Sequence, residues 1–163
     1  MADVLIYWRD YAGNRAASVG AGSAWRNDGG VLFWHSSAKC MGELLPGDRM
    51  WMVTSGKGLR RDPEQAAFLV AVWVVRDVNA NPGDDPAYPA EAYRTRVVAD
   101  PSASVTLTEP IPVDDVLRPE GRDRAMSIGR FLQGPRVLSD EKRRRLRAVA
   151  GGELAAEWLR AKG

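Results

Sequence analysis

The chain has 163 residues, of which 45% are hydrophobic and 27% are charged, and its formal net charge is +2. This size and composition predict one globular domain over residues 1–163 with a core of its own. A single cysteine, Cys40, and a single histidine, His35, exclude an internal disulfide and a Cys/His zinc site. No apolar run reaches membrane-spanning length and no segment resembles a secretion signal. We therefore expect a cytoplasmic, metal-free protein that does not contact a membrane.

The charge is unevenly distributed along the chain. From Arg118 onward there are 12 basic and 6 acidic residues, whereas the preceding 117 residues hold 11 basic and 15 acidic ones. A basic segment on a nearly neutral protein can form a face for a polyanion. The same segment can equally be the solvated side of a basic helix, and charge alone leaves both interpretations open.

Hydrophobic patterning predicts a chain of short strands connected by irregular loops. In chain order, we expect strands at 4–8, 31–35, 49–54, 68–75, 93–99 and 105–108. We expect helical segments at 36–45, capped by Ser36 or Ser37, at 112–117, at 139–150 and at 152–161. Ser139 is the expected N-cap of the third, and Gly151-Gly152 is expected to end it. These elements predict an α+β fold, namely a small mixed β-barrel with short peripheral helices.

The most informative stretch is the turn at Pro46-Gly47-Asp48 and the strand that follows it. Pro46 presets its backbone dihedral and Gly47 tolerates positive φ, so the turn is locally encoded. In the strand, alternate residues face opposite sides, which places Met50 and Met52 on one face and Trp51 and Val53 on the other. We expect the Asp48 carboxylate to accept hydrogen bonds from backbone N–H groups of the turn.

The chain contains no catalytic constellation that stands out. The stretch at 55–58 (Ser-Gly-Lys-Gly) lacks the upstream glycine of a phosphate-binding loop, and no dinucleotide fingerprint follows a strand. His35 could serve as a base for Cys40 or Ser36, but a lone histidine beside an apolar run is more often a hydrogen-bonded structural group. We expect no enzymatic activity and no cofactor, with a small hydrolase built on His35 as a distant alternative.

Six tryptophans are the chain's most notable aromatic feature. Trp8 and Trp73 lie in apolar runs, so we expect them in the core. Trp25 and Trp34 have polar neighbours able to contact the edge of a base, among them Asn27, His35, Ser36 and Ser37. Tryptophan rings around one concavity would form a slot in which a flat base could stack.

A second polar segment lies late in the chain, at 122–136. Its apolar residues (Met126, Ile128, Phe131 and Leu132) can pin it to the sheet. Its polar residues, Ser127, Arg130, Gln133 and Arg136, can then face a ligand or a phosphate.

Taken in order, three groups of residues resemble the EVE domain, a branch of the PUA-like barrels related to YTH domains. They are Trp25-Arg-Asn, then Met41 followed by Pro46-Gly-Asp-Arg-Met-Trp-Met-Val-Thr-Ser-Gly-Lys57, then Phe68-Leu-Val-Ala-Val-Trp-Val-Val75. The late segment 127–136 is similar to the one that closes the ligand pocket in such domains. The resemblance implies recognition of a modified base in DNA or RNA. We expect no attached nuclease, so this would be a reader that acts with a partner nuclease or other effector protein.

Two hypotheses follow, a nucleic-acid-binding module and a protein-interaction or small-ligand module without a nucleic-acid role. In the first, a flipped and modified base, for example a methylated one, would enter a pocket formed by Trp25, Asn27, Trp34, His35, Ser36, Ser55 and Gln133. Phosphates would be contacted by Lys57, Arg60, Arg61, Arg130, Arg136, Arg143 and Arg144.

Overall fold

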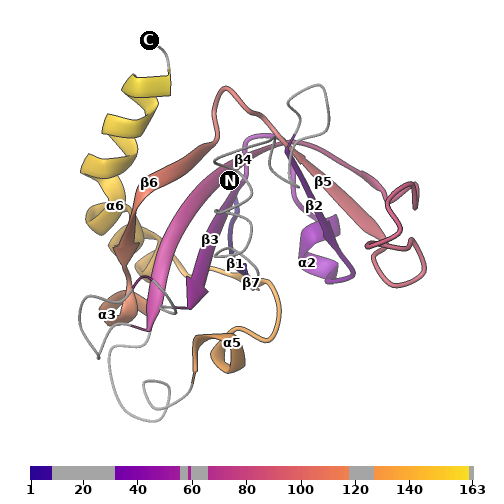
Figure 1. Cartoon of the computed structure of the whole chain (residues 1–163), viewed down its shortest axis with the longest axis horizontal. Coiled ribbons are helices and arrows are strands. Elements are labelled where there is room, and N and C mark those ends of the chain that lie inside the picture. The colour runs from indigo at the N-terminus through magenta and orange to yellow at the C-terminus, as the bar shows by residue number, and fades with distance from the viewer. Residues whose placement is uncertain (9–31, 56–58, 60–65, 118–126, 162–163) are drawn as a thin grey trace.

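The computed structural model describes residues 1–8, 32–55, 59, 66–117 and 127–161. In this part of the chain, seven strands and the helices around them follow one another as shown in Figure 1. In order they are β1 (Asp3–Tyr7), β2 (Leu32–Ser36), α2 (Lys39–Gly42), β3 (Arg49–Ser55), β4 (Ala67–Ala80), β5 (Thr95–Ala99), β6 (Val105–Pro112), α3 (Asp114–Leu117), α5 (Ile128–Phe131), β7 (Arg136–Val137) and α6 (Asp140–Ala161). The predicted strands are all present, with ends shifted by a few residues.

The seven strands form one strongly bent sheet in the order β2-β5-β4-β3-β1-β7, with β6 also paired to β4. The β1–β3 pair is parallel and the other pairs are antiparallel. The long strand β4 joins the two halves, because its first part pairs with β3 and β6 and its last part with β5. A register shift between Val75 and Asp77 marks the transition, and such bulges bend a strand.

The expected mixed barrel does not form, because the sheet is open. No pairing joins the edge strand β2 to β7 or β6 among the described residues. The expectation rested on uniformly short strands, whereas β4 spans 14 residues. A strand of that length pairs with other strands in both halves of the sheet. The sheet can therefore bend along β4 without closing into a barrel. The fold is therefore mixed α+β with an open, bent sheet.

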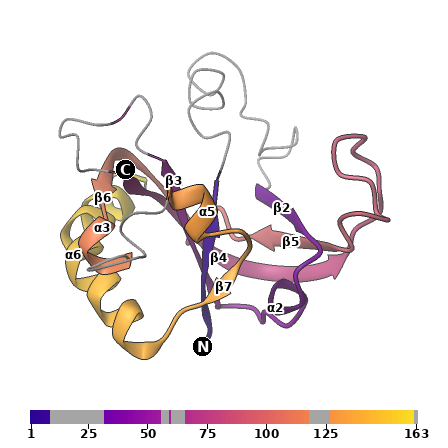
Figure 2. The same cartoon turned by 90° about the horizontal axis from the view of Figure 1, so that it is seen from below.

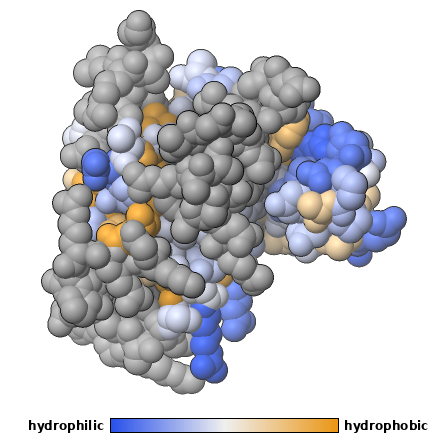
Figure 3. Space-filling model, in the orientation of Figure 1, coloured by the Kyte–Doolittle hydropathy of each residue, from blue (hydrophilic) through white to orange (hydrophobic). Residues whose placement is uncertain are grey.

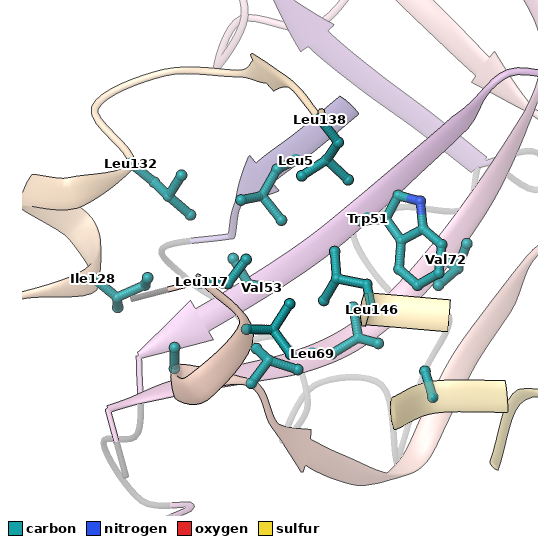
Figure 4. Packing of buried hydrophobic residues seen from close by; sticks show 14 of the residues in the cluster. Leu5, Trp51, Val53, Leu69, Val72, Leu117, Ile128, Leu132, Leu138 and Leu146 are labelled. Carbon is teal, nitrogen blue, oxygen red and sulfur yellow. The ribbon is translucent and has the colours of Figure 1, made fainter. Parts of the chain in front are cut away.

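The core consists of two clusters on opposite faces of the sheet. We call them the helix-side cluster, which includes residues of α3, α5 and α6, and the β2-side cluster, which includes residues of β2, α2 and β5. Strand β3 contributes to both, because Trp51 and Val53 pack in the first, and Met50 and Met52 in the second. The predicted alternation along β3 is thus confirmed. Figure 4 shows Trp51 and Val53 among the leucines of the helix-side cluster.

The turn before β3 forms as predicted. Gly47 has a φ of +92°, and the Asp48 N–H donates to the Leu45 carbonyl oxygen at 3.0 Å. The buried Asp48 carboxylate accepts from the backbone N–H of Leu45 at 2.8 Å and from that of Ala2 at 2.6 Å. The carboxylate therefore closes the turn and also fastens the start of the chain to it.

The last helix is longer than predicted. Residues Asp140–Ala161 form one continuous helix, so the expected break at Gly151-Gly152 is wrong. Leu146, Ala150 and Leu154 recur every four residues and are buried on one stripe. Their packing outweighs the cost of two helical glycines, about 1 kcal/mol each. The Ser139 cap is confirmed, since its Oγ accepts from the Lys142 N–H at 3.3 Å.

Smaller differences follow from local packing. Helix α2 is preceded by Ala38 at the cap position, and the Ser36 hydroxyl instead accepts from the Ala38 N–H at 3.1 Å. Strand β4 extends five residues beyond the predicted end at residue 75, to Ala80. On the face seen in Figure 3, mostly hydrophilic residues cover the region of α2, β5 and residues 81–94. No helix in the described part of the chain is long and apolar enough to cross a membrane.

Candidate functional site

A hollow of about 540 Å³ lies where the end of β1 meets β2 and the late segment around α5. It is lined by residues from four stretches: 6–7, 34–37, 93, and 127–135 except Ile128 and Phe131. In Figure 2, β1, β2 and α5 come together in the middle of the molecule. The hollow draws on both core clusters, since Ile6 belongs to the β2-side cluster and Leu132 to the helix-side cluster.

Most of the described pocket residues predicted from the sequence line this hollow. The structure brings together Trp34, His35, Ser36 and Gln133, and adds Arg130 from the predicted phosphate set. Ser55, at the end of β3, is not among the lining residues. Trp25 and Asn27 lie outside the described residues. Two chain segments about a hundred positions apart therefore form one concave surface.

Sequence reasoning missed two aromatic residues of the hollow, Tyr7 and Tyr93. Tyr7 was expected inside a strand at 4–8, but it is the last residue of β1 and is half-buried. Tyr93 was assigned to a strand, yet β5 begins only at Thr95. Both tyrosines lie next to a strand end, and this position in the sequence could have identified them as candidates for a pocket wall.

Trp34 is half-buried and rests on a buried aromatic pair. Its ring meets Trp73 edge to face, with centroids 6.5 Å apart and planes at 80°. Trp73 in turn meets Trp8 edge to face at 6.1 Å. Trp8 and Trp73 are buried in the β2-side cluster, which confirms their predicted place in the core. The aromatic support fixes the orientation of Trp34 at the wall of the hollow.

His35 is held by an arginine. The Arg96 Nε–H donates to His35 Nε2 at 2.9 Å, and the Arg96 Nη1 donates to the Asp84 Oδ2 at 3.2 Å. Burial, and next the Arg96 charge, lower the pKa of His35 below its usual 6.5. The imidazole is thus neutral at pH 7, and because Nε2 accepts, Nδ1 carries the proton.

This arrangement does not suit His35 as a general base. The Nε2 lone pair already accepts from Arg96, and Nδ1–H is a donor. The Cys40 thiol donates weakly to the Pro135 carbonyl oxygen, with sulfur and oxygen 3.7 Å apart, and burial raises the pKa of that thiol. A thiol with a raised pKa is a poor nucleophile. The hydrolase alternative therefore has no geometric support in the described residues.

The Tyr93 side of the hollow is braced by Asn81. Its Nδ2 donates to the carbonyl oxygens of Tyr88 at 2.8 Å and Tyr93 at 2.7 Å, and its Oδ1 accepts from the Gly83 N–H at 3.1 Å. The Tyr88 ring stacks on His35 with centroids 4.7 Å apart and meets Tyr93 edge to face at 5.2 Å. The loop from 81 to 94 is thus fixed to the imidazole before any ligand binds.

The late segment is anchored as predicted at three of its four apolar residues, and the fourth, Met126, lies outside the described residues. Ile128, Phe131 and Leu132 are buried, whereas Ser127, Arg130 and Gln133 are exposed. The Ser127 Oγ accepts from the Arg130 N–H at 3.3 Å and caps α5. Gly129 packs against Tyr7 so closely that a Cβ there would lie 3.1 Å from the Tyr7 Cε1. A larger residue at this position would therefore require the Tyr7 ring to shift by a few tenths of an ångström.

The predicted phosphate-binding residues fall into several groups. Lys57, Arg60 and Arg61 lie outside the described residues. Arg130 lines the hollow, Arg136 lies over the Phe131 ring with Cζ 5.0 Å from its centroid, and Arg144 is exposed on α6.

Arg143, which the sequence analysis assigns to a phosphate, has partners within the protein. Its Nη1 lies 3.4 Å from the buried Asp3 Oδ2 and donates to the Met1 carbonyl oxygen at 3.2 Å, and its Nη2 donates to Asp140 at 2.5 Å. Arg145 is engaged too, with the Asp115 carbonyl oxygen at 2.9 Å. The basic run of α6 therefore serves largely to fasten the helix to the rest of the protein.

No family model matches the chain, and no curated protein sequence matches it. Among solved structures, it is similar to that of Rpa0253 from Rhodopseudomonas palustris, with 14% identity and a TM-score of 0.49 over 93% of this chain and 94% of that one. It is also similar to a point mutant of ZmASCH from Zymomonas mobilis, with 11% identity and a TM-score of 0.47 over 90% of this chain and 97% of that one. Likenesses of this degree carry no function over, and the resemblance to the EVE domain stays a prediction.

Proposed function

We propose that this chain binds nucleic acid and takes one unpaired base into the hollow beside Trp34. The observation that supports this most is the meeting of the segments 34–37 and 127–135 around one concave surface. That surface has an aromatic wall, polar side chains able to contact a base edge, and an arginine at its margin. These are the parts that single-strand recognition requires.

In this proposal Trp34 supplies the stacking surface. The ring is held by Trp73 and is half-buried, so part of it remains accessible. Stacking of a base on an aromatic side chain is worth about 1–3 kcal/mol. Because Trp34 is held in place before binding, little side-chain entropy is lost when a base stacks on it.

Polar groups of the hollow would read the edge of the base. Ser36 and Gln133 each offer both a donor and an acceptor, and neutral His35 offers the Nδ1–H as a donor. The hollow therefore holds donors and acceptors in both of its main segments. A base edge that matched them would be preferred over one that left a buried group unpaired.

We propose that the preferred base is a methylated one. Ile6 and Leu132 are buried residues that contribute apolar surface to the hollow. Removing one methyl group from water stabilises a complex by about 0.8 kcal/mol, which corresponds to about a fourfold preference. We propose that the protein prefers methylated over unmodified strands by about this factor, and that any downstream act belongs to a partner nuclease or other effector.

The alternative is a small-ligand site without a nucleic-acid role. A volume of about 540 Å³ lies within the range of small-molecule pockets, about 300–1,000 Å³. On this alternative a free nucleoside or another flat ligand would bind as tightly as an oligonucleotide does.

The test is a titration of the purified protein against single-stranded oligonucleotides that carry a panel of modified bases, with the free nucleosides beside them. Trp34→Ala should lower the affinity about tenfold or more, whereas Trp34→Phe, which keeps a ring, should lose much less. Circular dichroism checks that both variants fold. Equal affinity in the wild-type protein and in folded Trp34→Ala would overturn the proposal, and equal binding of nucleoside and strand would favour the alternative.

A further inference from the structure

Two cations lie over one aromatic ring beside the hollow. The Arg136 Cζ is 5.0 Å and the Lys142 Nζ 5.6 Å from the centroid of the Phe131 ring. Their charges are therefore no farther apart than the sum of these distances, which is about one Debye length at 0.1 M salt, about 10 Å. Phe131 is buried, so the ring itself is fixed while the two cationic side chains reach the surface.

The carboxylates nearest to Lys142 in sequence are already engaged with other arginines. Asp140 pairs with Arg143, and Glu141 lies 4.0 Å from Arg145. In the part of the chain that the structure describes, neither Arg136 nor Lys142 is paired with a carboxylate. The face of the ring attracts each cation, but it adds no negative net charge. The pair is therefore a local positive charge that an anion would stabilise.

The cation pair is continuous with the hollow. Gln133, Gly134 and Pro135 line the hollow, and Arg136 follows them directly. Three peptide steps of about 3.8 Å each span at most about 11 Å, so the Cα of Arg136 lies within that distance of the Cα of Gln133. A strand with one base in the hollow would thus have a phosphate within reach of the pair.

We infer that Arg136 and Lys142, held on the Phe131 ring, form an anion site for a backbone phosphate of the strand whose base occupies the hollow. This inference rests on the proposed function, and it makes the ligand class more specific. The ligand is a single strand with at least one phosphate next to the inserted base, rather than a free nucleoside. The two cations add affinity that does not depend on which base is bound, because phosphate contacts carry no sequence information.

The test compares the double variant R136Q/K142Q with a control of equal charge change, R49Q/R76Q, whose arginines lie at the start of β3 and on β4 and do not line the hollow. The probes are a single-stranded oligonucleotide carrying the preferred base and the corresponding free nucleoside. For single strands, each lost phosphate contact reduces the magnitude of the slope of log K against log salt concentration by about 0.7. R136Q/K142Q should therefore flatten it by about 1.4 and weaken oligonucleotide binding about tenfold at 0.1 M salt, with nucleoside binding unchanged. R136K/K142R, which keeps both charges, should retain most of the affinity.

The outcomes separate this inference from the proposed function. If the wild-type protein binds no oligonucleotide, both are overturned. If it binds and Trp34→Ala abolishes binding, but R136Q/K142Q behaves like the control, only the anion site is overturned. If R136Q/K142Q also weakens nucleoside binding by the same factor, the pair acts on the hollow itself and the phosphate assignment is overturned.

Discussion

The carboxylate of Asp3 accepts a hydrogen bond from the indole Nε1–H of Trp51 at 2.8 Å, and both residues are buried. The other carboxylate oxygen lies 3.4 Å from the guanidinium groups of Arg143 and Arg147. One buried carboxylate thus joins β1, β3 and α6. Trp51 packs in the helix-side cluster beside Val72 (Figure 4), so this contact fixes the basic helix to the core.

Asp3→Ala should lower the free energy of unfolding by about 3 kcal/mol, because it leaves a buried indole N–H without its acceptor and removes the carboxylate that Arg143 and Arg147 share. Asp3→Asn, which keeps an acceptor for Trp51, should cost less. Urea denaturation measures both. The control is Asp140→Ala, which removes the exposed partner of Arg143 and should cost well under 1 kcal/mol. A loss below about 0.5 kcal/mol for Asp3→Ala would show that the contact is dispensable.

Asp48 should matter for stability and not for ligand binding. Its carboxylate accepts from two backbone N–H groups, those of Ala2 and Leu45, and it does not line the hollow. Asp48→Ala should cost about 1–2 kcal/mol, in line with two orphaned donors. Asp77→Ala on the exposed end of β4 serves as the control. An affinity loss in Asp48→Ala without a loss of stability would reverse the assignment.

The continuity of α6 can be tested at its glycines. A Cβ on Gly151 would meet nothing within 4 Å, and the φ of Gly151 is not positive. Gly151→Ala should therefore raise the free energy of unfolding by about 0.5–1 kcal/mol. Gly47→Ala, at a φ of +92°, should instead lower it by about 1 kcal/mol. If Gly151→Ala were destabilising, the helix would end there, as the sequence pattern predicted.

His35 should make stability depend on pH in a defined window. Burial and Arg96 lower the pKa of His35 in the folded protein below 6.5, the value that it has when unfolded. Below pH 6.5 the unfolded chain binds a proton that the folded protein resists, so stability falls as pH falls from about 7 toward 5. Above pH 7, His35 does not make the free energy of unfolding depend on pH. It is the chain's single histidine, so His35→Gln, which keeps an acceptor for Arg96, should remove this slope from denaturation curves. If the pH dependence of stability were unchanged in that variant, it would arise from carboxylates and not from His35.

The sequence was informative wherever local chemistry decides the structure. The alternation of Met50, Trp51, Met52 and Val53 and the hydrogen bond from Leu45 to Asp48 follow from residues within a few positions of one another. The convergence of Trp34 and Gln133 was expected on other grounds, namely the resemblance of segment 127–136 to the one that closes the ligand pocket in EVE domains.

The features that sequence reasoning missed depend on distant partners. Arg143 was assigned to a phosphate because nothing near it in sequence indicates Asp3, 140 positions away. The run through Gly151 and Gly152 is helical because Leu146, Ala150 and Leu154 pack along one stripe, which outweighs local propensity. Tyr7 became a wall of the hollow only because β1 ends there.

The most direct test of the proposed site is photochemical crosslinking of the full-length protein to a single-stranded oligonucleotide with a photoreactive base, such as 5-iodouracil, at the position of the inserted base. Mass spectrometry then locates the crosslinked residues. We predict that they fall at the hollow, in particular at Tyr7, Trp34 and Tyr93, and that excess unlabelled strand carrying the preferred base suppresses them. Crosslinks confined to α6, with none at the hollow, would contradict the account and leave only non-specific electrostatic binding.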